Sequence, residues 1–402
     1  MNWPAVKMSE LFRVKHGYAF KGQYFESDGP YVLLTPGSFN EEGGYRDQGD
    51  KKKFYTGDVP DGYVLDEGDL LVAMTEQAPG LLGSSAWIPE AARFLHNQRL
   101  GRIVDLDERR LDKRFLYYLF NTREVRQRIA ASATGGKVRH TAPERIGQVV
   151  VQLPPRRVQR RVADILSTYD DLIENSRRRM ALLEEAARQL YREWFVRLRF
   201  PGHKHTRITH GMPEGWEPKG LGDLCEEVLE SVSPHALEPG TPYIGLEHIP
   251  RRSISLSGWG KADQVTSNKH RFREGEILFG KIRPYFHKVG VAFVDGVASS
   301  DAIVIRPLDS KLRGLVLMTV SSDQFVAVAA QTMREGSKMP RADWKQMQQY
   351  MVPLPPDGLL STFDSAIESI VEQLKALAFQ NQKLRAARDL LVPRLMSGEI
   401  VV

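Results

Sequence analysis

The tripeptide Leu-Pro-Pro occurs twice, as Leu153-Pro154-Pro155 and as Leu354-Pro355-Pro356, and a long helical pattern follows each copy. The two copies lie 201 residues apart in a chain of 402 residues. This spacing predicts two similar halves, each ending in a long helix, related by a pseudo-twofold internal repeat.

Both helical patterns carry a narrow stripe of residues spaced three and four apart, which is typical of a coiled-coil seam. In the second pattern the stripe contains Leu360, Phe363, Ile367, Ile370, Leu374, Leu377, Leu384, Leu391 and Leu395. In the first pattern it contains Val158, Val162, Ile165, Tyr169, Leu172, Ser176, Met180, Leu183, Ala187, Leu190 and Trp194. A lone helix would expose its stripe to water, so we expect the two helices to pack on each other as an antiparallel pair.

Three residues interrupt the second pattern. Asn381 and Arg388 fall on the stripe, where a polar residue can fix the register of a seam at some cost in stability. The alternative for Arg388 is that its charged end extends outward into solvent. Pro393 is expected to stop or bend the helix near Leu391, because proline has no N–H group to donate.

The composition is that of a globular protein of two or three domains, with 42% hydrophobic and 26% charged residues. No apolar run approaches the roughly 18 to 20 residues of a membrane span, and the first residues do not resemble a signal peptide, so we expect a cytoplasmic protein. The single cysteine, Cys225, agrees with a reducing compartment and is predicted to be buried. A net charge of +6 favours an anionic partner such as nucleic acid.

Strand-like runs between Gly- and Pro-rich turns predict an α/β (α+β) fold with two globular domains. The predicted parts are domain 1 at 1–152, a long helix at 153–200, a linker at 201–215, domain 2 at 216–353 and a second long helix at 354–402. From Lys137 and Lys338 onward, equivalent positions differ by a constant 201, whereas the globular parts differ in length. We therefore expect the helices to be a fixed frame and the domains to carry different specificities.

The order of these parts resembles the DNA specificity subunit of type I restriction-modification enzymes. The resemblance rests on the order of these parts together with the segment 75–83 (Thr-Glu-Gln-Ala-Pro-Gly-Leu-Leu-Gly), the Gly-Lys elements, the segment 153–196, the linker 212–224 and the ending 393–400. It implies two target recognition domains, each reading one half of a split DNA target, held apart by the helix pair. It also implies that the helices dock two methyltransferase (modification) subunits and that restriction (translocase) subunits join them. S-adenosylmethionine, ATP and Mg would belong to those partners, and this chain would be non-catalytic and bind no cofactor.

The residues themselves show no catalytic or metal-binding motif. Residues 275–281 have the spacing that begins a P-loop, but Ile282 stands where Ser or Thr must bind magnesium, and the interior is strand-like. His203, His205 and His210 lie in the turn-rich linker without cysteines or carboxylates at ligand spacing, so we expect a solvated linker.

The candidate DNA contacts are basic, aromatic or polar residues near predicted turns. They are Lys51, Lys52, Lys53, Tyr55, Thr75, Gln77, Lys137, Arg139, Lys281, Arg283, Tyr285, Lys338 and Arg341. Lysine and arginine suit phosphate contacts, and Thr or Gln can bond base edges. Lys137 with Arg139, and Lys338 with Arg341, recur at equivalent places after Gly-containing turns. The alternative for each basic cluster is ordinary solvated surface charge.

Other classes of function remain open. A coiled-coil adaptor predicts no DNA binding even when partner subunits are present. A DNA-reading subunit of a methylation-only or related defence system would have the same sequence features without a nuclease partner. A nucleic-acid-modifying enzyme with an unrecognised site predicts that the purified chain alone turns over DNA.

Overall fold

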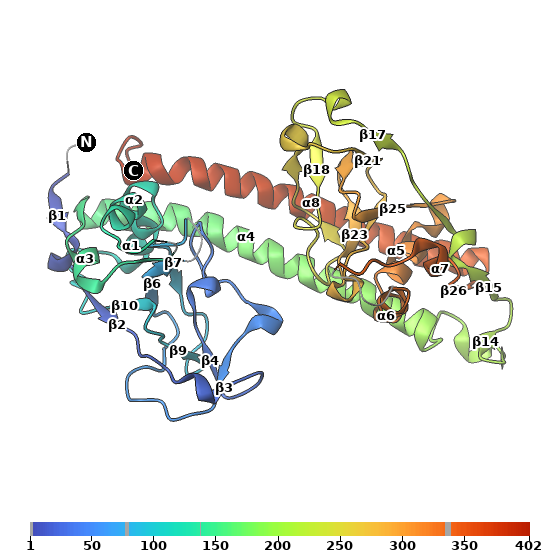
Figure 1. Cartoon of the computed structure of the whole chain (residues 1–402), viewed down its shortest axis with the longest axis horizontal. Helices are drawn as coiled ribbons and strands as arrows, with labels where there is room; N and C mark the ends of the chain where they lie inside the picture. The colour runs from blue at the N-terminus through green and yellow to red at the C-terminus, as the bar shows by residue number, and fades with distance from the viewer. Residues whose placement is uncertain (1–2, 77–79, 137, 334–338) are drawn as a thin grey trace. The chain divides into compact units, whose positions relative to one another are not determined.

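The computed structural model describes residues 3–76, 80–136, 138–333 and 339–402 (Figure 1). The chain divides into two compact units: unit 1 comprises Met1–Asp171 and Arg385–Val402, and unit 2 comprises Leu172–Leu384. The long helices α4 (Arg156–Tyr191) and α8 (Asp357–Met396) each contribute to both units. Each unit thus contains one globular domain and parts of both long helices. The domain boundaries expected from the sequence, which separate the helices from the domains, stay predictions.

Unit 1 is built on two four-stranded sheets. The first is antiparallel, with the order β2 (Arg13–His16), β10 (Leu100–Val104), β6 (Leu70–Ala73), β8 (Ser85–Trp87). The second has the order β3 (Phe25–Glu26), β5 (Phe54–Tyr55), β4 (Tyr31–Leu33), β9 (Phe94–Leu95), with β4 and β9 parallel. Successive side chains of a strand face opposite sides. Leu70 and Val72 of β6 therefore enter the core beside the helices, and Leu71 enters the core shared with β4 and β9.

Short elements complete unit 1. Two strand pairs are β1 (Ala5–Lys7) with β12 (Val150–Gln152), and β7 (Thr75–Glu76) with β11 (Arg139–His140). The short helices are α1 (Lys113–Phe120), α2 (Arg123–Ala131) and α3 (Pro143–Gly147). The side chains of Asp112 and Thr122 accept hydrogen bonds from the first free N–H groups of α1 and α2, which fixes where these helices begin.

Unit 2 repeats this plan with larger sheets. One has the order β16 (Cys225–Glu227), β25 (Ala302–Pro307), β22 (Ile277–Gly280), β23 (Val289–Ala292), β19 (Ser255–Leu256). The other has the order β17 (Ser231–Val232), β21 (Lys269–Phe272), β24 (Gly296–Ala298), β18 (Pro242–Ile244), β20 (Gly260–Lys261). The remaining elements are the pair β15 (Glu217–Gly220) with β26 (Met351–Leu354) and the helices α5 (Arg313–Val320), α6 (Asp323–Gln331) and α7 (Trp344–Met347). Strand β22 is the equivalent of β6: Ile277 and Phe279 face one core, and Leu278 faces the other.

The predicted linker contains a hairpin of β13 (Ile208–Thr209) and β14 (Met212–Pro213). Cys225 is buried as predicted, and burial raises the pKa of its thiol to about 12. In the described part of the chain, no single helix is long and apolar enough to cross a membrane. The bent pair Ser310–Val320 and Asp323–Gln331 passes by length and composition alone.

The predicted helix pairing is confirmed within each unit. In unit 1, Val162 and Leu166 of α4 share a core with Leu395 and Met396 of α8, so the start of one helix packs on the end of the other. In unit 2, Phe363 of α8 packs among the rings of Tyr191, Trp194 and Phe195 at centroid distances of 4.8 to 6.5 Å. Among the predicted seam residues the buried ones are Val162, Phe363, Leu374 and Leu377, and the half-buried ones are Tyr169, Leu183, Leu190, Ile370 and Leu384.

Two details of the predicted helices were wrong. Leu172 is 43% exposed and its neighbour Ile173 is 3% exposed, so Ile173, not Leu172, is the buried residue at this place on α4. Helix α8 does not stop near Leu391 but continues through Pro393 to Met396, and the alternative that Pro393 bends the helix stays a prediction. Proline removes only one hydrogen bond of the helix, and the burial of Leu395 and Met396 in the core of unit 1 holds this last turn.

The two polar seam residues are both enclosed. The Nη1 atom of Arg388 lies 2.7 Å from Asp170 Oδ1, and the hydroxyl of Tyr118 donates to Asp170 Oδ2 at 2.7 Å. Arg388 therefore does not simply extend into solvent. Asn381 is 6% exposed, and its Nδ2 lies 3.9 Å from the sulfur of Met180 on α4.

Candidate nucleic-acid interface

The loop that follows β22 in unit 2 brings four of the predicted residues together. Its residues Lys281, Arg283 and Tyr285 lie beside the segment that carries Arg341, because Ile282 and Arg341 form an antiparallel bridge. The backbone contacts are Ala342 N to Lys281 O at 2.8 Å, Arg283 N to Pro340 O at 3.0 Å and Lys281 N to Asp301 O at 2.9 Å. The guanidinium of Arg341 also bonds Asp301, at 3.0 Å. Two segments distant in the sequence thus form one cationic surface.

Aromatic rings extend this surface. Tyr285 is 54% exposed, and its ring meets the ring of Phe286 edge-on at 5.0 Å. The guanidinium of Arg251 lies 4.0 Å from the centroid of Phe286, a cation–π contact that fixes its position. Arg251 was not among the predicted contacts, because its partner ring lies on a separate loop.

Three non-glycine residues at this place adopt a left-handed backbone: Arg252, Arg283 and His287 have φ of 54°, 48° and 53°. Such a conformation costs an L-residue roughly 1 to 2 kcal/mol. Hydrogen bonds hold it, from Phe286 N to Arg283 O, from His287 N to Pro284 O and from Arg252 N to His287 O, at 2.8 to 2.9 Å. Strain that is held in this way is typical of functional loops.

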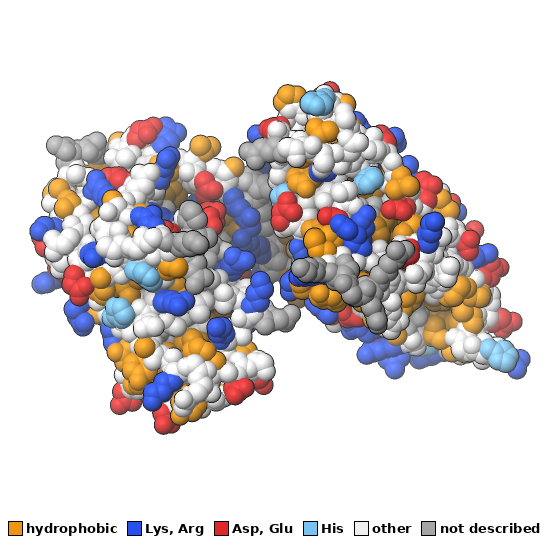
Figure 2. Space-filling model, viewed as in Figure 1, with side chains coloured by type: hydrophobic (Ala, Val, Ile, Leu, Met, Phe, Trp, Pro, Cys, Tyr) orange, Lys and Arg blue, Asp and Glu red, His pale blue; other side chains and the backbone are white. Residues whose placement is uncertain are grey.

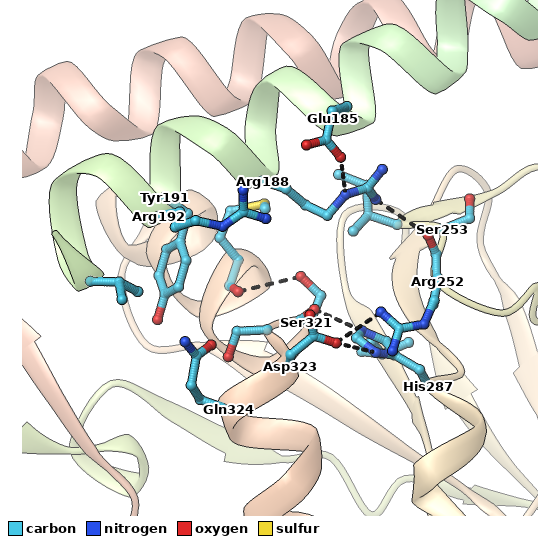
Figure 3. A pocket seen from close by; sticks show the side chains of 15 residues that line it. Glu185, Arg188, Tyr191, Arg192, Arg252, Ser253, His287, Ser321, Asp323 and Gln324 are labelled. Atoms are coloured by element: carbon cyan, nitrogen blue, oxygen red, sulfur yellow. Dashed lines mark hydrogen bonds and ion pairs between the residues drawn. The ribbon is translucent and has the colours of Figure 1, made fainter.

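A cavity of about 310 Å³ behind the loop shows what supports it (Figure 3). Arg252 bonds Asp323 at the start of α6 at 2.9 Å, and His287 Nε2 lies 2.8 Å from the backbone oxygen of Ser321. Burial lowers the pKa of His287, so this ring is neutral and structural near neutral pH. From the other side, Arg188 of α4 bonds Glu185 and the backbone oxygen of Arg252. The cavity wall therefore anchors the cationic loop to α6 and α4.

The residues that follow β6 in unit 1, at the position equivalent to the cationic loop, are buried. Thr75 is 5% exposed, and its hydroxyl lies 3.0 Å from His140 Nδ1. Glu76 is 4% exposed and accepts hydrogen bonds from the N–H groups of Leu81 and Leu82 at 3.1 and 3.0 Å. The pairing of β7 with β11 turns the Thr75 side chain inward, so its hydroxyl presents no exposed surface for the predicted DNA contact. Gln77, Lys137 and Lys338 lie outside the described residues.

Strand register also changes one predicted equivalence. Thr75 pairs with His140 in unit 1, and Ile282 pairs with Arg341 in unit 2. Arg341 therefore stands in the place of His140, not of Arg139. Arg139 instead lies opposite Glu76, with a guanidinium to carboxylate distance of 3.4 Å.

Comparison with known proteins shows which proteins this chain is similar to. Residues 1–185 match the family described as type I restriction modification DNA specificity domain. The type I restriction enzyme MjaIX specificity subunit of Methanocaldococcus jannaschii is 21% identical over 304 residues, which cover 72% of this chain and 69% of the relative. The EcoDI specificity subunit of Escherichia coli is 24% identical over 267 residues, covering 60% and 59%. The first 185 residues are therefore similar to the DNA specificity domain of type I restriction-modification systems. A crystal structure of the S subunit from M. genitalium shares the fold, with a TM-score of 0.58, 15% identity and coverage of 98% of this chain and 96% of that one.

The remaining predicted contacts, apart from Arg139, lie in or just before β5, a strand of the second sheet of unit 1. Lys52 bonds Asp47 at 2.8 Å, Lys53 lies 5.6 Å above the ring of Phe25, and Lys51 is exposed. Tyr55 is 2% exposed within an aromatic cluster, so its side chain presents no exposed surface for the predicted DNA contact.

Figure 2 shows basic and acidic side chains interspersed on the visible face of each unit. Net charge alone therefore does not outline the interface. The Arg-Arg-Val-Gln-Arg-Arg run at 156–161 is a further basic cluster that was not among the predicted contacts. Its like charges at three- and four-residue spacing on one helix face were the signal that could have found it.

Proposed function

We propose that this chain is the DNA-reading specificity subunit of a type I restriction-modification complex, with one half of a two-part DNA target read by each unit. The observation that carries the proposal is the repeat itself. The order β2-β10-β6-β8 in unit 1 recurs as β16-β25-β22-β23 in unit 2. The loops that follow the equivalent strands β6 and β22 differ in exposure and charge. Two units with the same strand order but different loops are suited to recognising two different DNA sequences.

In unit 2 the reader would be the loop 281–286. Arginine can bond a guanine or a phosphate through two N–H groups at once, so Arg283 and Arg341 suit either contact. Lys281 adds a charge for phosphate contact. Tyr285 supplies exposed apolar area beside them. The anchoring of the loop through Arg252 and His287 keeps these groups in place before DNA arrives, which reduces the ordering cost of binding.

We further propose that the helix pair docks two methyltransferase subunits and that restriction subunits join this assembly in the cytoplasm. S-adenosylmethionine, ATP and Mg would bind to those partners, and this chain would select the target without catalysing a reaction. The cationic loop of unit 2 favours DNA reading over a purely structural adaptor. A methylation-only system would use the same surfaces, and it differs only in the absence of a nuclease subunit.

An exchange of domains tests the proposal. Residues 1–152, which include both β1 and its partner β12, would be replaced by the corresponding domain of another specificity subunit. The hybrid would be expressed with its methyltransferase subunit, and methylated adenines would be mapped by single-molecule sequencing. We expect one half-site to change and the other to stay.

The reciprocal exchange of residues 216–353 is the matched control and should change the other half-site. If either exchange altered both half-sites, the two units would not read DNA independently. If no methylation depended on this chain, the DNA-reading function itself would be wrong.

A further inference from the structure

The first two turns of α4 carry four arginines, and three of them face solvent together. Arg156 is held within unit 1, with Nη1 2.6 Å from Asp112 Oδ2 and Nε donating to the backbone oxygen of Glu108. Arg157, Arg160 and Arg161 are exposed and line one open hollow. At 100° per residue they point away from the buried seam residues Val162 and Leu166. We call these three residues the arginine face.

No acidic side chain of the described chain neutralises the arginine face. Asp164 lies on the same side of the helix, but its Oδ1 is 2.8 Å from Arg114. Asp112 is engaged by Arg156: burial alone would raise the pKa of this carboxyl, but the hydrogen bond from Arg156 lowers it below its usual value. Within the described residues, the arginine face therefore makes no ion pair.

The arginine face is unfavourable for the isolated helix. Arg157 lies three and four residues before Arg160 and Arg161, and like charges at these spacings repel on a helix surface. Positive side chains in the first turns also oppose the helix macrodipole, whose positive end is at the N-terminus. A bound anion would relieve both effects.

The frame of the protein does not require these charges. At the constant separation of 201 residues, Arg157, Arg160 and Arg161 correspond to Gly358, Ser361 and Thr362 of α8. Two copies of one partner subunit that docked in the same way on both helices would need the same chemistry twice. A DNA backbone presents the same charge at every step and needs no matching protein surface. An arginine face in one unit only therefore fits DNA better than it fits a repeated protein contact.

We propose that the arginine face binds the phosphate backbone of duplex DNA, in addition to the contacts that read bases. This inference rests on the proposed function, DNA reading by the chain. Arg157 and Arg161 are about 6 Å apart along the helix axis. Every second phosphate of one strand is separated by about 6.8 Å along the duplex axis. Arginine also bonds phosphate through two N–H groups, which makes it better suited than a point charge.

The test uses the complex of this chain with its methyltransferase subunits and a variant with Arg157→Gln, Arg160→Gln and Arg161→Gln. Binding to the mapped target duplex and to a scrambled duplex of equal length would be measured over a range of salt concentrations. Losing three phosphate contacts should make the slope of log affinity against log salt shallower by about 2.7. Affinity for both duplexes should fall by the same factor.

Two further variants separate charge from structure. Lysine at the same three positions keeps the charge and should keep the wild-type slope. Arg177→Gln with Arg178→Gln and Arg179→Gln removes three exposed charges from the unit 2 part of α4 and should leave the slope unchanged. The glutamine variant of the arginine face should unfold at or above the wild-type temperature, because the substitution removes repulsion.

Several results would overturn the inference. An unchanged slope would show that no phosphate is bound there, and loss of co-purifying methyltransferase subunits would make the arginine face a protein contact. A loss confined to the target duplex would make these residues base readers. If the glutamine variant unfolded at a lower temperature than the wild type, the arginine face would be stabilising in the free protein, contrary to the inferred repulsion. Failure of the proposed function is distinct, because the wild-type complex itself would then bind both duplexes equally.

Discussion

Replacing Asp170 by Asn tests whether the enclosed polar contact on the helix seam stabilises unit 1. Asp170 accepts from Arg388 through one oxygen and from Tyr118 through the other, each at 2.7 Å. The Arg388 and Asp170 side chains are 20% and 28% exposed, so water screens their attraction only in part. Burial lowers the pKa of Arg388, but the hydrogen bond from its guanidinium to Asp170 outweighs this, and the pKa is raised overall.

The expected loss of unfolding free energy in Asp170→Asn depends on the partners that Arg388 and Tyr118 keep. Breaking a buried ion pair costs about 3 to 5 kcal/mol when the surviving charge has no other partner. Arg388 keeps Asp389 at 2.9 Å, and the new amide oxygen can still accept from Tyr118. We therefore expect the free energy of unfolding to fall by about 2 kcal/mol.

The assay is urea unfolding of the full chain followed by circular dichroism. Asp171→Asn is the matched control, because Asp171 is the next residue on α4, is exposed, and makes no ion pair among the described residues. If the two variants lowered the midpoint equally, the contact would contribute nothing and the reasoning would fail. Replacing both partners, with Asp170→Leu and Arg388→Met, should recover much of the loss, since no buried charge is then left unpaired.

Two other predictions concern the seam and the response to pH. Leu374→Asp should lower the free energy of unfolding by more than about 3 kcal/mol, because it places a charge at a site with 0% exposure. Leu172→Asp at 43% exposure should cost much less, and equal costs in urea unfolding would contradict the assigned seam. His96 is fully buried, and burial lowers its pKa from 6.5 to about 4. The unfolded chain then binds a proton that the folded chain does not, so stability should fall by up to about 3 kcal/mol as pH drops from 6.5 toward 4. His96→Gln should flatten this dependence, and an unaltered pH profile would assign it to other groups.

The long helices and their seam were predictable because they depend on local spacing. Periodicity selected Val162 and Leu374 correctly, since both are fully buried in cores that contain residues of the two helices. It could not choose between the adjacent apolar residues Leu172 and Ile173. Two consecutive four-residue steps around Ser176 rotate the stripe there, and only packing decides which residue is buried.

The candidate site was only partly predictable because burial depends on contacts between distant segments. Charge and turn position selected Lys281 and Arg341 separately, and the bridge between Ile282 and Arg341 that brings them together could not be read from the sequence. Thr75 looked equally suitable, but its partner His140 lies 65 residues away, and strand pairing alone turns the hydroxyl inward. Tyr55 is also buried by residues distant in the sequence, because the second sheet of unit 1 brings several aromatic side chains into contact with its ring.

The way the helices are shared has a consequence for synthesis on the ribosome. Unit 2 occupies one continuous segment, Leu172–Leu384, whereas unit 1 needs Arg385–Val402 as well as the N-terminal residues. Until that last segment emerges, the core of unit 1 lacks the apolar cover that Leu395 and Met396 provide. The unit that is made first can therefore finish folding only after the unit that is made second. A premature stop codon after residue 384 would leave the sequence of unit 2 complete. It would instead disrupt unit 1, most of which is encoded at the opposite end of the gene.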